Sequence, residues 1–357
     1  MKKTVLFNRH KRLNAKIVDF AGYMMPISYS SVNEEHIHVR NKVGIFDVSH
    51  MGEFEISGLN SLEFVQYLCS NDISKIKVGK AQYNCLTNES GGIIDDLIVY
   101  RLDTDKFLLV VNASNISKNW KWIKSINKKF NCSISNFSDD ISLLAIQGPD
   151  AESLCQQYTE DNLSSLKNYS FFIGKFAGID DILISKTGYT GSGGYEIYIP
   201  NKEVLKIWDT LFSNEEYDLK PIGLAARDTL RIEMGYCLYG NDINEDTSPI
   251  EANLRWITKT ETNFIGSNSI EEQIISGIRK KLIGFKLIQK SIPRSGYEIY
   301  NVEKKLIGSV TSGTFSPTLK IGIGLAYVDI NCIDNENIYI KIRDKFIKAE
   351  IVKTPFI

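Results

Sequence analysis

Residues 93–99, Ile-Ile-Asp-Asp-Leu-Ile-Val, form an apolar segment that is interrupted by two adjacent carboxylates, Asp95 and Asp96. Gly91-Gly92 before it predicts a turn, and the aliphatic residues that follow predict a buried β-strand. Adjacent strand residues point to opposite faces, so the two carboxylates cannot share one environment. Because a carboxylate is rarely fully buried without a partner, at least one of them is expected to face the interior or a cleft. The acidic pair therefore requires a chemical explanation.

Size and charge exclude several classes of protein. A chain of 357 residues predicts two or three domains. Lys plus Arg is 42 and Asp plus Glu is 43, so the net charge of -1 predicts neither nucleic-acid nor membrane binding. The apolar run Val5-Leu6-Phe7 is too short for a signal peptide, and no run approaches the roughly 18 residues of a membrane helix. The six cysteines are scattered without a Cys-x-x-Cys motif, which favours a cytoplasmic location.

Hydrophobic periodicity predicts helices that alternate with short strands. Ser31 and Glu34 form a capping box for a helix that carries Val32, Val39 and Val43 and ends near Gly44. A second capping box predicts a short helix from Ser269 to Ile275. Other helices are predicted from Ser61, around Trp120–Ile126, after Pro149, from Asn201 and over 221–235; strands are predicted at 53–57, 81–87, 93–101, 106–112, 141–146, 171–176, 180–187 and 193–199. Short strands separated by Gly, Pro, Asn and Asp then predict a separate C-terminal barrel or sandwich.

Two polar positions stand out further along the chain. The glycine cluster at 187–196 lacks the Lys-Ser/Thr ending of a phosphate loop and the Rossmann glycine spacing. Glu196 is the last residue of this cluster, where it is either a ligand-binding carboxylate or a solvated strand residue. Arg227, in the predicted helix 221–235, could fork onto a carboxylate or a planar polar ligand, and the alternative is an ion pair within its own helix.

Metal and covalent chemistry are not expected. His36 and His38 are two residues apart on a helix and cannot share a face, which argues against a metal site in Glu34–His38. The segment Asp47-Val-Ser-His50 contains the residue types of a catalytic triad, but a triad is defined by spatial roles. The sequence has no Gly-x-Ser-x-Gly elbow either.

Nine segments in order together resemble the T-protein family of the glycine cleavage system, the tetrahydrofolate-dependent aminomethyltransferases. Each segment alone is weak, whereas nine in the family's order are specific. They are DFAGYMMPISYSS (19–31), GIFDVSHMGEFEISG (44–58), QYNCLTNESGGIIDDLIVY (82–100), AIQGPDA (145–151), TGYTGSGGYEIYIP (187–200), GLAARDTLRIEMGYCLYGNDI (223–243), TSPIEANLRW (247–256), NFIG (263–266), and GSVTSGTFSPTL with IGIGLAYV (308–319 and 321–328).

The resemblance implies an α+β fold of three domains, with mixed and antiparallel sheets around a central hole and a C-terminal β-barrel. Domain 1 is expected to be discontinuous and to comprise 1–52 and 141–256. Domain 2 is expected at 53–140 as a ferredoxin-like α+β unit, with part of 200–245 as a candidate addition. A connecting helix at 257–278 and the barrel at 279–357 complete the expected organisation.

The family's reaction moves the methylene carbon of the S-aminomethyl-dihydrolipoyl H-protein to tetrahydrofolate. The products are 5,10-methylenetetrahydrofolate, ammonia and the dihydrolipoyl H-protein. The resemblance thus implies tetrahydrofolate as co-substrate, no metal, the lipoylated H-protein as partner and a functional link to the P- and L-proteins. The basic residues of the first 16 positions are a weak candidate for meeting an acidic carrier.

The resemblance also assigns site residues. Asp96 matches the family's carboxylate near N5 and N10 of the folate and is the candidate catalytic residue, whereas Asp95 is expected to be structural. Glu196 matches the residue that accepts a fork of N–H donors from the pterin, and Arg227 matches an arginine that contacts the folate. The remaining candidates are cavity-lining residues, Met51, Tyr83, Tyr189 and, with weaker support, Trp256.

Two alternatives remain open within this resemblance. One is another tetrahydrofolate-dependent demethylase of the same fold, or the folate half of a sarcosine or dimethylglycine oxidase, although this chain has no room for their flavin domain. The other is a non-enzymatic folate-binding factor of iron-sulfur cluster maintenance. That factor carries a Lys-Gly-Cys motif, and none of the six cysteines here follows a glycine.

Overall fold

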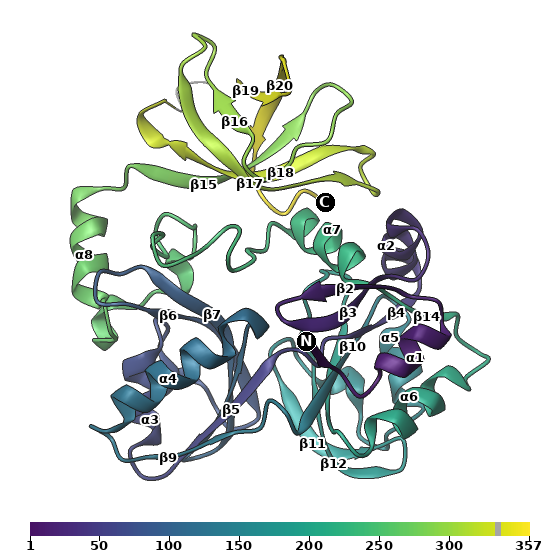
Figure 1. The fold of residues 1–357 in the computed structure, drawn as a ribbon. Coiled ribbons are helices and arrows are strands. Elements are labelled where there is room, and N and C mark those ends of the chain that lie inside the picture. Colours follow the sequence, from purple (N-terminus) through teal and green to yellow (C-terminus); the bar gives the residue numbers. More distant parts are fainter. Residues whose placement is uncertain (333–336) are drawn as a thin grey trace. The chain divides into compact units, whose positions relative to one another are not determined.

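Figure 1 shows the computed structural model, which describes residues 1–332 and 337–357. The chain divides into two compact units. Unit 1 comprises Met1–Val65, Ser74–Gln82 and Leu97–Asp228, and unit 2 comprises Gln66–Ile73, Tyr83–Asp96 and Thr229–Ile357. The boundaries fall within helices α3 (Ser61–Leu68) and α7 (Leu224–Met234), within the short 3-10 helix Ile73–Lys75, and within strands β6 (Lys80–Thr87) and β7 (Ile93–Asp103). The three-domain division expected from the sequence stays a prediction.

A six-stranded sheet organises much of unit 1, in the order β11-β12-β13-β10-β4-β14. Its strands are β4 (Val43–Asp47), β10 (Ile141–Gln147), β11 (Phe171–Phe176), β12 (Ile179–Ser185), β13 (Gly194–Pro200) and β14 (Leu219–Pro221). The pairings are antiparallel except that β14 runs parallel to β4. The strands predicted at 141–146, 171–176, 180–187 and 193–199 are confirmed, with small shifts at their ends.

Alternation along β13 separates an apolar face from a polar one. Tyr195, Ile197 and Ile199 are fully buried and belong to the core that helices α5 (Ala151–Gln156) and α6 (Val204–Phe212) complete. Successive strand residues point to opposite faces, so Glu196 and Tyr198 lie on the other side of the sheet. This side carries the polar groups described below.

The N-terminal part of unit 1 holds a three-stranded sheet in the order β1-β3-β2 and two helices. These elements are β1 (Lys2–Lys3), α1 (Phe7–Arg12), β2 (Lys16–Phe20), β3 (Tyr23–Ser28) and α2 (Val32–Asn41). The capping box that Ser31 and Glu34 predict for α2 is confirmed. The placement of Val43 in that helix is wrong: Lys42 leaves helical geometry, and Val43 begins β4 and pairs with Leu219.

A five-stranded sheet has the order β6-β7-β8-β5-β9. It contains β5 (Gly52–Ser57), β8 (Lys106–Val111) and β9 (Ser133–Asn136), together with β6 and β7. The helices of this part of the chain are α3 (Ser61–Leu68) and α4 (Ile116–Asn127). The strands predicted at 53–57, 81–87, 93–101 and 106–112 are confirmed.

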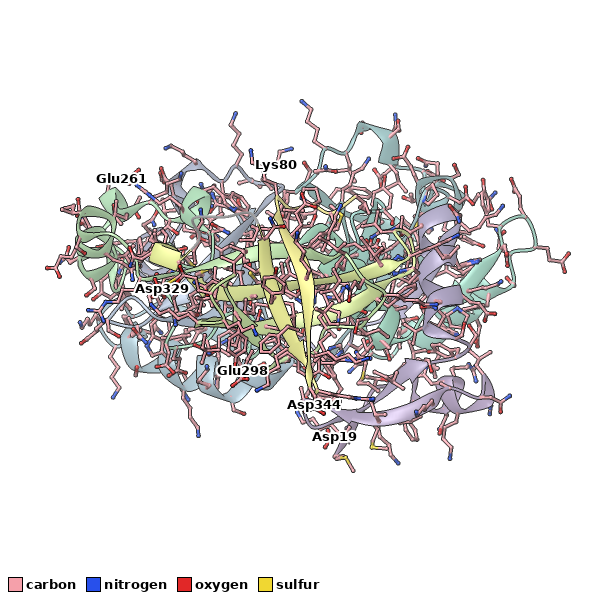
Figure 2. All side chains as sticks on the ribbon, turned by 90° about the horizontal axis from the view of Figure 1, so that it is seen from above. Asp19, Lys80, Glu261, Glu298, Asp329 and Asp344 are labelled. Carbon is pink, nitrogen blue, oxygen red and sulfur yellow. The ribbon has the colours of Figure 1, made fainter. Side chains whose placement is uncertain are left out.

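Unit 2 contains a closed barrel, β15-β18-β17-β16-β19-β20, which confirms the predicted C-terminal all-β region. Its strands are β15 (Lys280–Leu287), β16 (Glu298–Tyr300), β17 (Leu306–Ser316), β18 (Ile321–Asp329), β19 (Asn337–Ile342) and β20 (Lys345–Val352). Apolar side chains such as Phe285 and Ile340 are buried, whereas Asp329 and Asp344 are exposed to solvent (Figure 2).

Helix α8 (Ser267–Ser276) precedes the barrel. The predicted capping box at Ser269 is wrong, because the helix begins two residues earlier, after Gly266. Gly266 has a φ of +83° and caps the helix without a side chain. Among the residues that the structure describes, no helix is both long and apolar enough to cross a membrane.

Candidate functional site

In unit 2, Asp96 is held by a tyrosine from the neighbouring part of the chain. The Tyr83 hydroxyl donates to Asp96 Oδ2 at 2.8 Å. Burial raises the pKa of Tyr83 well above its ordinary value, and the negative charge of Asp96 raises it further, so Tyr83 remains a proton donor. A hydrogen bond from a neutral hydroxyl to a carboxylate is charge-assisted, which fixes the orientation of Asp96.

The two adjacent carboxylates have different surroundings, as strand alternation predicts. Asp95 has no exposed surface, whereas Asp96 is partly exposed. A reacting group must be reachable, so Asp96 is the member of the pair that a ligand could contact. This difference agrees with the structural role expected for Asp95.

The tyrosine that holds Asp96 lies next to a second aromatic ring of unit 2. The rings of Tyr83 and Trp256 are 6.1 Å apart with an interplanar angle of 36°. Trp256 is 60% exposed, which is unusual for so large an apolar side chain. An oriented carboxylate next to exposed aromatic surface can bind a flat, polar ring by stacking and hydrogen bonding.

In unit 1, Glu196 is held by the residue that begins the glycine cluster. The Thr187 hydroxyl donates to Glu196 Oε2 at 2.5 Å. Burial raises the pKa of Glu196, while the hydrogen bond from Thr187 and the positive charge of Arg227 act in the opposite direction. Glu196 is only partly buried by its neighbours, so it is more than a solvated strand residue but is still open to a ligand.

Arg227 stacks on an aromatic residue of the same cluster. Its guanidinium carbon lies 4.5 Å from the centroid of the Tyr189 ring. This cation–π contact, with a partner outside helix α7, fixes the plane of the guanidinium. The structure thus brings Glu196, Arg227 and Tyr189 together in one unit.

The glycine cluster at 187–196 is packed against strand β10. Gln147 accepts a hydrogen bond from the Thr190 hydroxyl at 2.9 Å and donates to the Thr187 carbonyl at 3.2 Å. A Cβ at Gly188 would lie 2.1 Å from the Gln147 side chain, and one at Gly194 would lie 2.2 Å from the Ile146 carbonyl. The glycines therefore allow close packing that positions Thr187.

The segment Asp47-Val-Ser-His50 does not form a triad. Asp47 Oδ2 is 2.8 Å from His10 Nε2, and the Ser49 hydroxyl oxygen accepts from the Leu143 amide at 3.0 Å. Burial, followed by the positive charge of Arg227, lowers the pKa of His50 to about 4, so this imidazole is neutral near pH 7. Met51, which follows it, is partly exposed.

The residues of the Glu34–His38 segment have structural partners. Glu35 accepts hydrogen bonds from the backbone amides of Tyr29, Ser30 and Gly223. The His38 ring donates a hydrogen bond to the backbone carbonyl of Asp218 at 2.7 Å. Over residues 1–332 and 337–357, no group of three or more His, Cys, Asp or Glu side chains could hold a metal ion.

The predicted site residues thus form two groups, one in each unit. Asp96, Tyr83 and Trp256 belong to unit 2, and the members in unit 1 are Met51, Tyr189, Glu196 and Arg227. Sequence reasoning missed Thr187, the hydrogen-bond donor to Glu196. Its only signal in the sequence was its position at the start of the glycine cluster.

Two family models together match almost the whole chain. The family model described as "GCVT N-terminal domain" matches residues 6–262, and the one described as "Glycine cleavage T-protein C-terminal barrel domain" matches residues 280–357. Proteins named aminomethyltransferase from Flavobacterium psychrophilum and Phocaeicola vulgatus are 51% and 49% identical, each over 100% of this chain and 99% of their own.

A solved structure agrees over the same length. The crystal structure of glycine cleavage system aminomethyltransferase T from Bartonella henselae matches with a TM-score of 0.93 and 32% identity, and covers 100% of this chain and 98% of that one. The sheets and helices define an α+β protein with several sheets and a C-terminal closed barrel. Within that class, the chain belongs to the glycine cleavage T-protein family.

Proposed function

We propose that this protein is the aminomethyltransferase of the glycine cleavage system, with tetrahydrofolate as its co-substrate. The end-to-end similarity to proteins named aminomethyltransferase supports this activity. Among the structural observations, the hydrogen bond from Tyr83 to Asp96 carries the proposal, because it holds a reachable carboxylate in one orientation. Such a group is what the reaction requires beside the nitrogen atoms of the folate.

The reaction exchanges bonds around a single carbon without oxidation or reduction. Bonds from that carbon to N5 and N10 of tetrahydrofolate form, while its bonds to the amino nitrogen and to the lipoyl sulfur break. The N–H protons lost by the folate balance those gained by the leaving ammonia and the dihydrolipoyl thiol. A carbon that is losing ammonia becomes cationic and iminium-like, so a fixed carboxylate stabilises it electrostatically.

Asp96 is the catalytic residue in this proposal. Its partly exposed carboxylate would accept a hydrogen bond from the folate and stabilise the developing positive charge. The pre-set orientation means that little reorganisation is needed when the reaction occurs. Tyr83 and Trp256 would pack against the folate with their rings.

Glu196 and Arg227 bind the folate in this proposal, together with Tyr189 and Met51. The pterin ring presents adjacent N–H donors, and a carboxylate accepts two of them as a fork. The stacking of Arg227 on Tyr189 keeps the guanidinium in place for a contact with the ligand. Met51 adds a polarisable thioether to the apolar surroundings.

The proposal also includes the protein partners and the location. The aminomethyl donor is carried by the lipoylated H-protein, and the P- and L-proteins perform the other steps of the system. All six cysteines lie in the described part of the chain and none of them forms a disulfide, which suits a reducing compartment such as the cytoplasm.

Release of ammonia tests the function directly. The purified protein should release ammonia from aminomethylated H-protein only when tetrahydrofolate is present, and should form 5,10-methylenetetrahydrofolate in equal amount. Sarcosine and dimethylglycine, offered with the same folate, separate this activity from that of related demethylases. Turnover of either amine, with none of the H-protein substrate, would overturn the proposal.

Calorimetry of tetrahydrofolate binding tests the residues in unit 1. Glu196→Ala and Arg227→Ala should each weaken binding by about tenfold or more, because each removes a hydrogen-bonding charged group. Wild-type affinity in both variants would return the two residues to a structural role.

A further inference from the structure

Three hydroxyl groups in unit 1, two of them from buried tyrosines, form a chain that ends on Glu196. The Tyr198 hydroxyl lies 3.0 Å from that of Tyr100, which lies 3.2 Å from Thr187 Oγ1. Thr187 Oγ1 in turn lies 2.5 Å from Glu196 Oε2. Tyr100 and Tyr198 have at most 5% exposed surface, so these bonds do not compete with bulk water.

Donors and acceptors give the chain one direction. An ionised carboxylate only accepts, so Thr187 must use its single proton for Glu196. Tyr100 must then donate to Thr187, and Tyr198 donates to Tyr100. The second lone pair of Thr187 Oγ1 is available to the Ser185 hydroxyl, 2.9 Å away. Every proton in the chain points toward Glu196.

The backbone explains how these distant residues meet. Glu196 and Tyr198 are two residues apart on β13 and therefore share a face. Ser185, on β12, pairs directly with Glu196, and Gln147 holds the Thr187 carbonyl. Tyr100 comes from β7 and lies edge-on to Tyr198, with ring centroids 5.6 Å apart.

We propose that Tyr100 and Tyr198, acting through Thr187, are positioning residues that fix the Glu196 carboxylate for a ligand edge with two adjacent N–H donors. This inference rests on the proposed folate-binding role of Glu196. One carboxylate oxygen is anchored by Thr187, which sets the rotation of the carboxylate plane. Hydrogen bonds in a chain polarise one another, so the hydroxyls of Tyr100 and Tyr198 strengthen the bond from Thr187.

The surrounding charged groups act consistently with this role. Arg227 favours the ionised form of Glu196. Near the other end of the chain, Glu53 is fully buried, and neither of its carboxyl oxygens has a hydrogen-bond partner among the described residues. Burial raises the pKa of Glu53 well above its ordinary value, which favours its neutral form.

The test compares tetrahydrofolate binding by calorimetry in five variants of the full-length protein, one of which is Glu196→Gln. Thr187→Val removes the direct donor and should weaken binding about tenfold or more, and Tyr100→Phe should weaken it about three- to tenfold. Thr187→Ser keeps the hydroxyl and should restore most of the affinity. Tyr195→Phe is the matched control, since it removes a buried tyrosine hydroxyl of the same strand that bonds Glu152 instead.

The pH profile separates positioning from a loss of structure. Binding that needs ionised Glu196 is lost as the pH falls through the pKa of that group. Removing the chain removes stabilisation of the carboxylate, so Thr187→Val and Tyr100→Phe should lose binding at a pH about half a unit to one unit higher. The profile of Tyr195→Phe should match that of the wild type. For a 2-desamino pterin analogue, the difference in affinity between wild type and Thr187→Val should be smaller than for tetrahydrofolate.

The outcomes distinguish this inference from the proposed function. If Glu196→Gln weakens binding but Thr187→Val and Tyr100→Phe keep wild-type affinity and pH profile, the hydroxyl chain has no positioning role. If all variants, including Thr187→Ser and Tyr195→Phe, weaken binding equally, the effect is general loosening and the inference fails. If Glu196→Gln itself binds as tightly as wild type, the proposed function of Glu196 fails.

Discussion

The buried ion pair between Arg231 and Asp242 in unit 2 allows a stability prediction to be worked out atom by atom. Arg231 Nη1 lies 2.6 Å from Asp242 Oδ2, and the two side chains are 1% and 0% exposed. Asp242 Oδ2 also accepts from the Leu238 amide and the Ser312 hydroxyl, each at 2.9 Å. Ser312 belongs to β17, so the pair connects helix α7 to the barrel.

The substitution Asp242→Asn removes the charge and spares the hydrogen bonds. The new amide oxygen can remain on the side of Arg231. On the other side, the Thr311 hydroxyl bonds Asp242 Oδ1 and lies 3.1 Å from the Leu325 carbonyl. It can turn its proton to that carbonyl and accept from the new NH₂ group. The cost is then the uncompensated buried guanidinium, about 3–5 kcal/mol.

Hydrogen exchange measured by mass spectrometry is the direct assay. A loss of about 3 kcal/mol in the free energy of opening unit 2 speeds the exchange that occurs through this opening by about a hundredfold. The faster exchange should appear in peptides from β17 and α7. Glu298→Gln is the control, because it removes a solvent-exposed ion pair with Lys341 in the same barrel and should leave exchange unchanged. Unchanged exchange of β17 in Asp242→Asn would refute the reasoning.

Two further predictions concern unit 1. Burial opposes ionisation of Asp47, but hydrogen bonds from His10, Ser49 and Thr4 hold its pKa below the ordinary value. The contribution of ionised Asp47 to folding stability is therefore present above about pH 4 and is lost as the pH falls through the pKa of the folded state. The stability of Asp47→Asn should consequently depend less steeply on pH in acid than that of the wild type. Gly194 has a φ of +130° and would place a Cβ 2.2 Å from the Ile146 carbonyl, so Gly194→Ala should destabilise the protein by several kcal/mol, whereas Gly193→Ala, with open space around the Cβ, should cost about 1 kcal/mol for its φ of +77°. Thermal unfolding checks this prediction: equal unfolding midpoints for Gly194→Ala and Gly193→Ala would contradict it.

Local signals in the sequence predicted local structure well. The cap of α2 depends on Ser31 and Glu34, which are three residues apart, and it is confirmed. The same pattern at Ser269 failed because Gly266, in a left-handed conformation, starts α8 earlier. Val43 matched the helical stripe of α2, but its pairing with Leu219, 176 positions later in the chain, places it in β4. The strand conformation of Val43 thus depends on a partner that is distant in the sequence.

The candidate site shows the same limit. Strand alternation alone predicted that Asp95 and Asp96 differ, and the structure gives them different burial. The partners of the carboxylates depend on tertiary packing: Tyr83 reaches Asp96 from the adjoining strand, and Tyr100 reaches Thr187 across 87 positions. No periodicity in the sequence encodes such contacts. The sequence identified acidic groups in unusual places, and the structure shows which neutral donors orient them.

The most direct test of the proposed catalysis is ammonia release by Asp96→Asn with saturating tetrahydrofolate and aminomethylated H-protein. Asparagine keeps the size of the side chain and removes its negative charge, so the rate should fall by about a hundredfold or more. Tyr83→Phe, which keeps the carboxylate and removes only its donor, should show a smaller loss. Folate binding by both variants, measured in parallel, separates a loss of catalysis from a loss of binding. Equal rates for Asp96→Asn and wild type would contradict the catalytic role of Asp96.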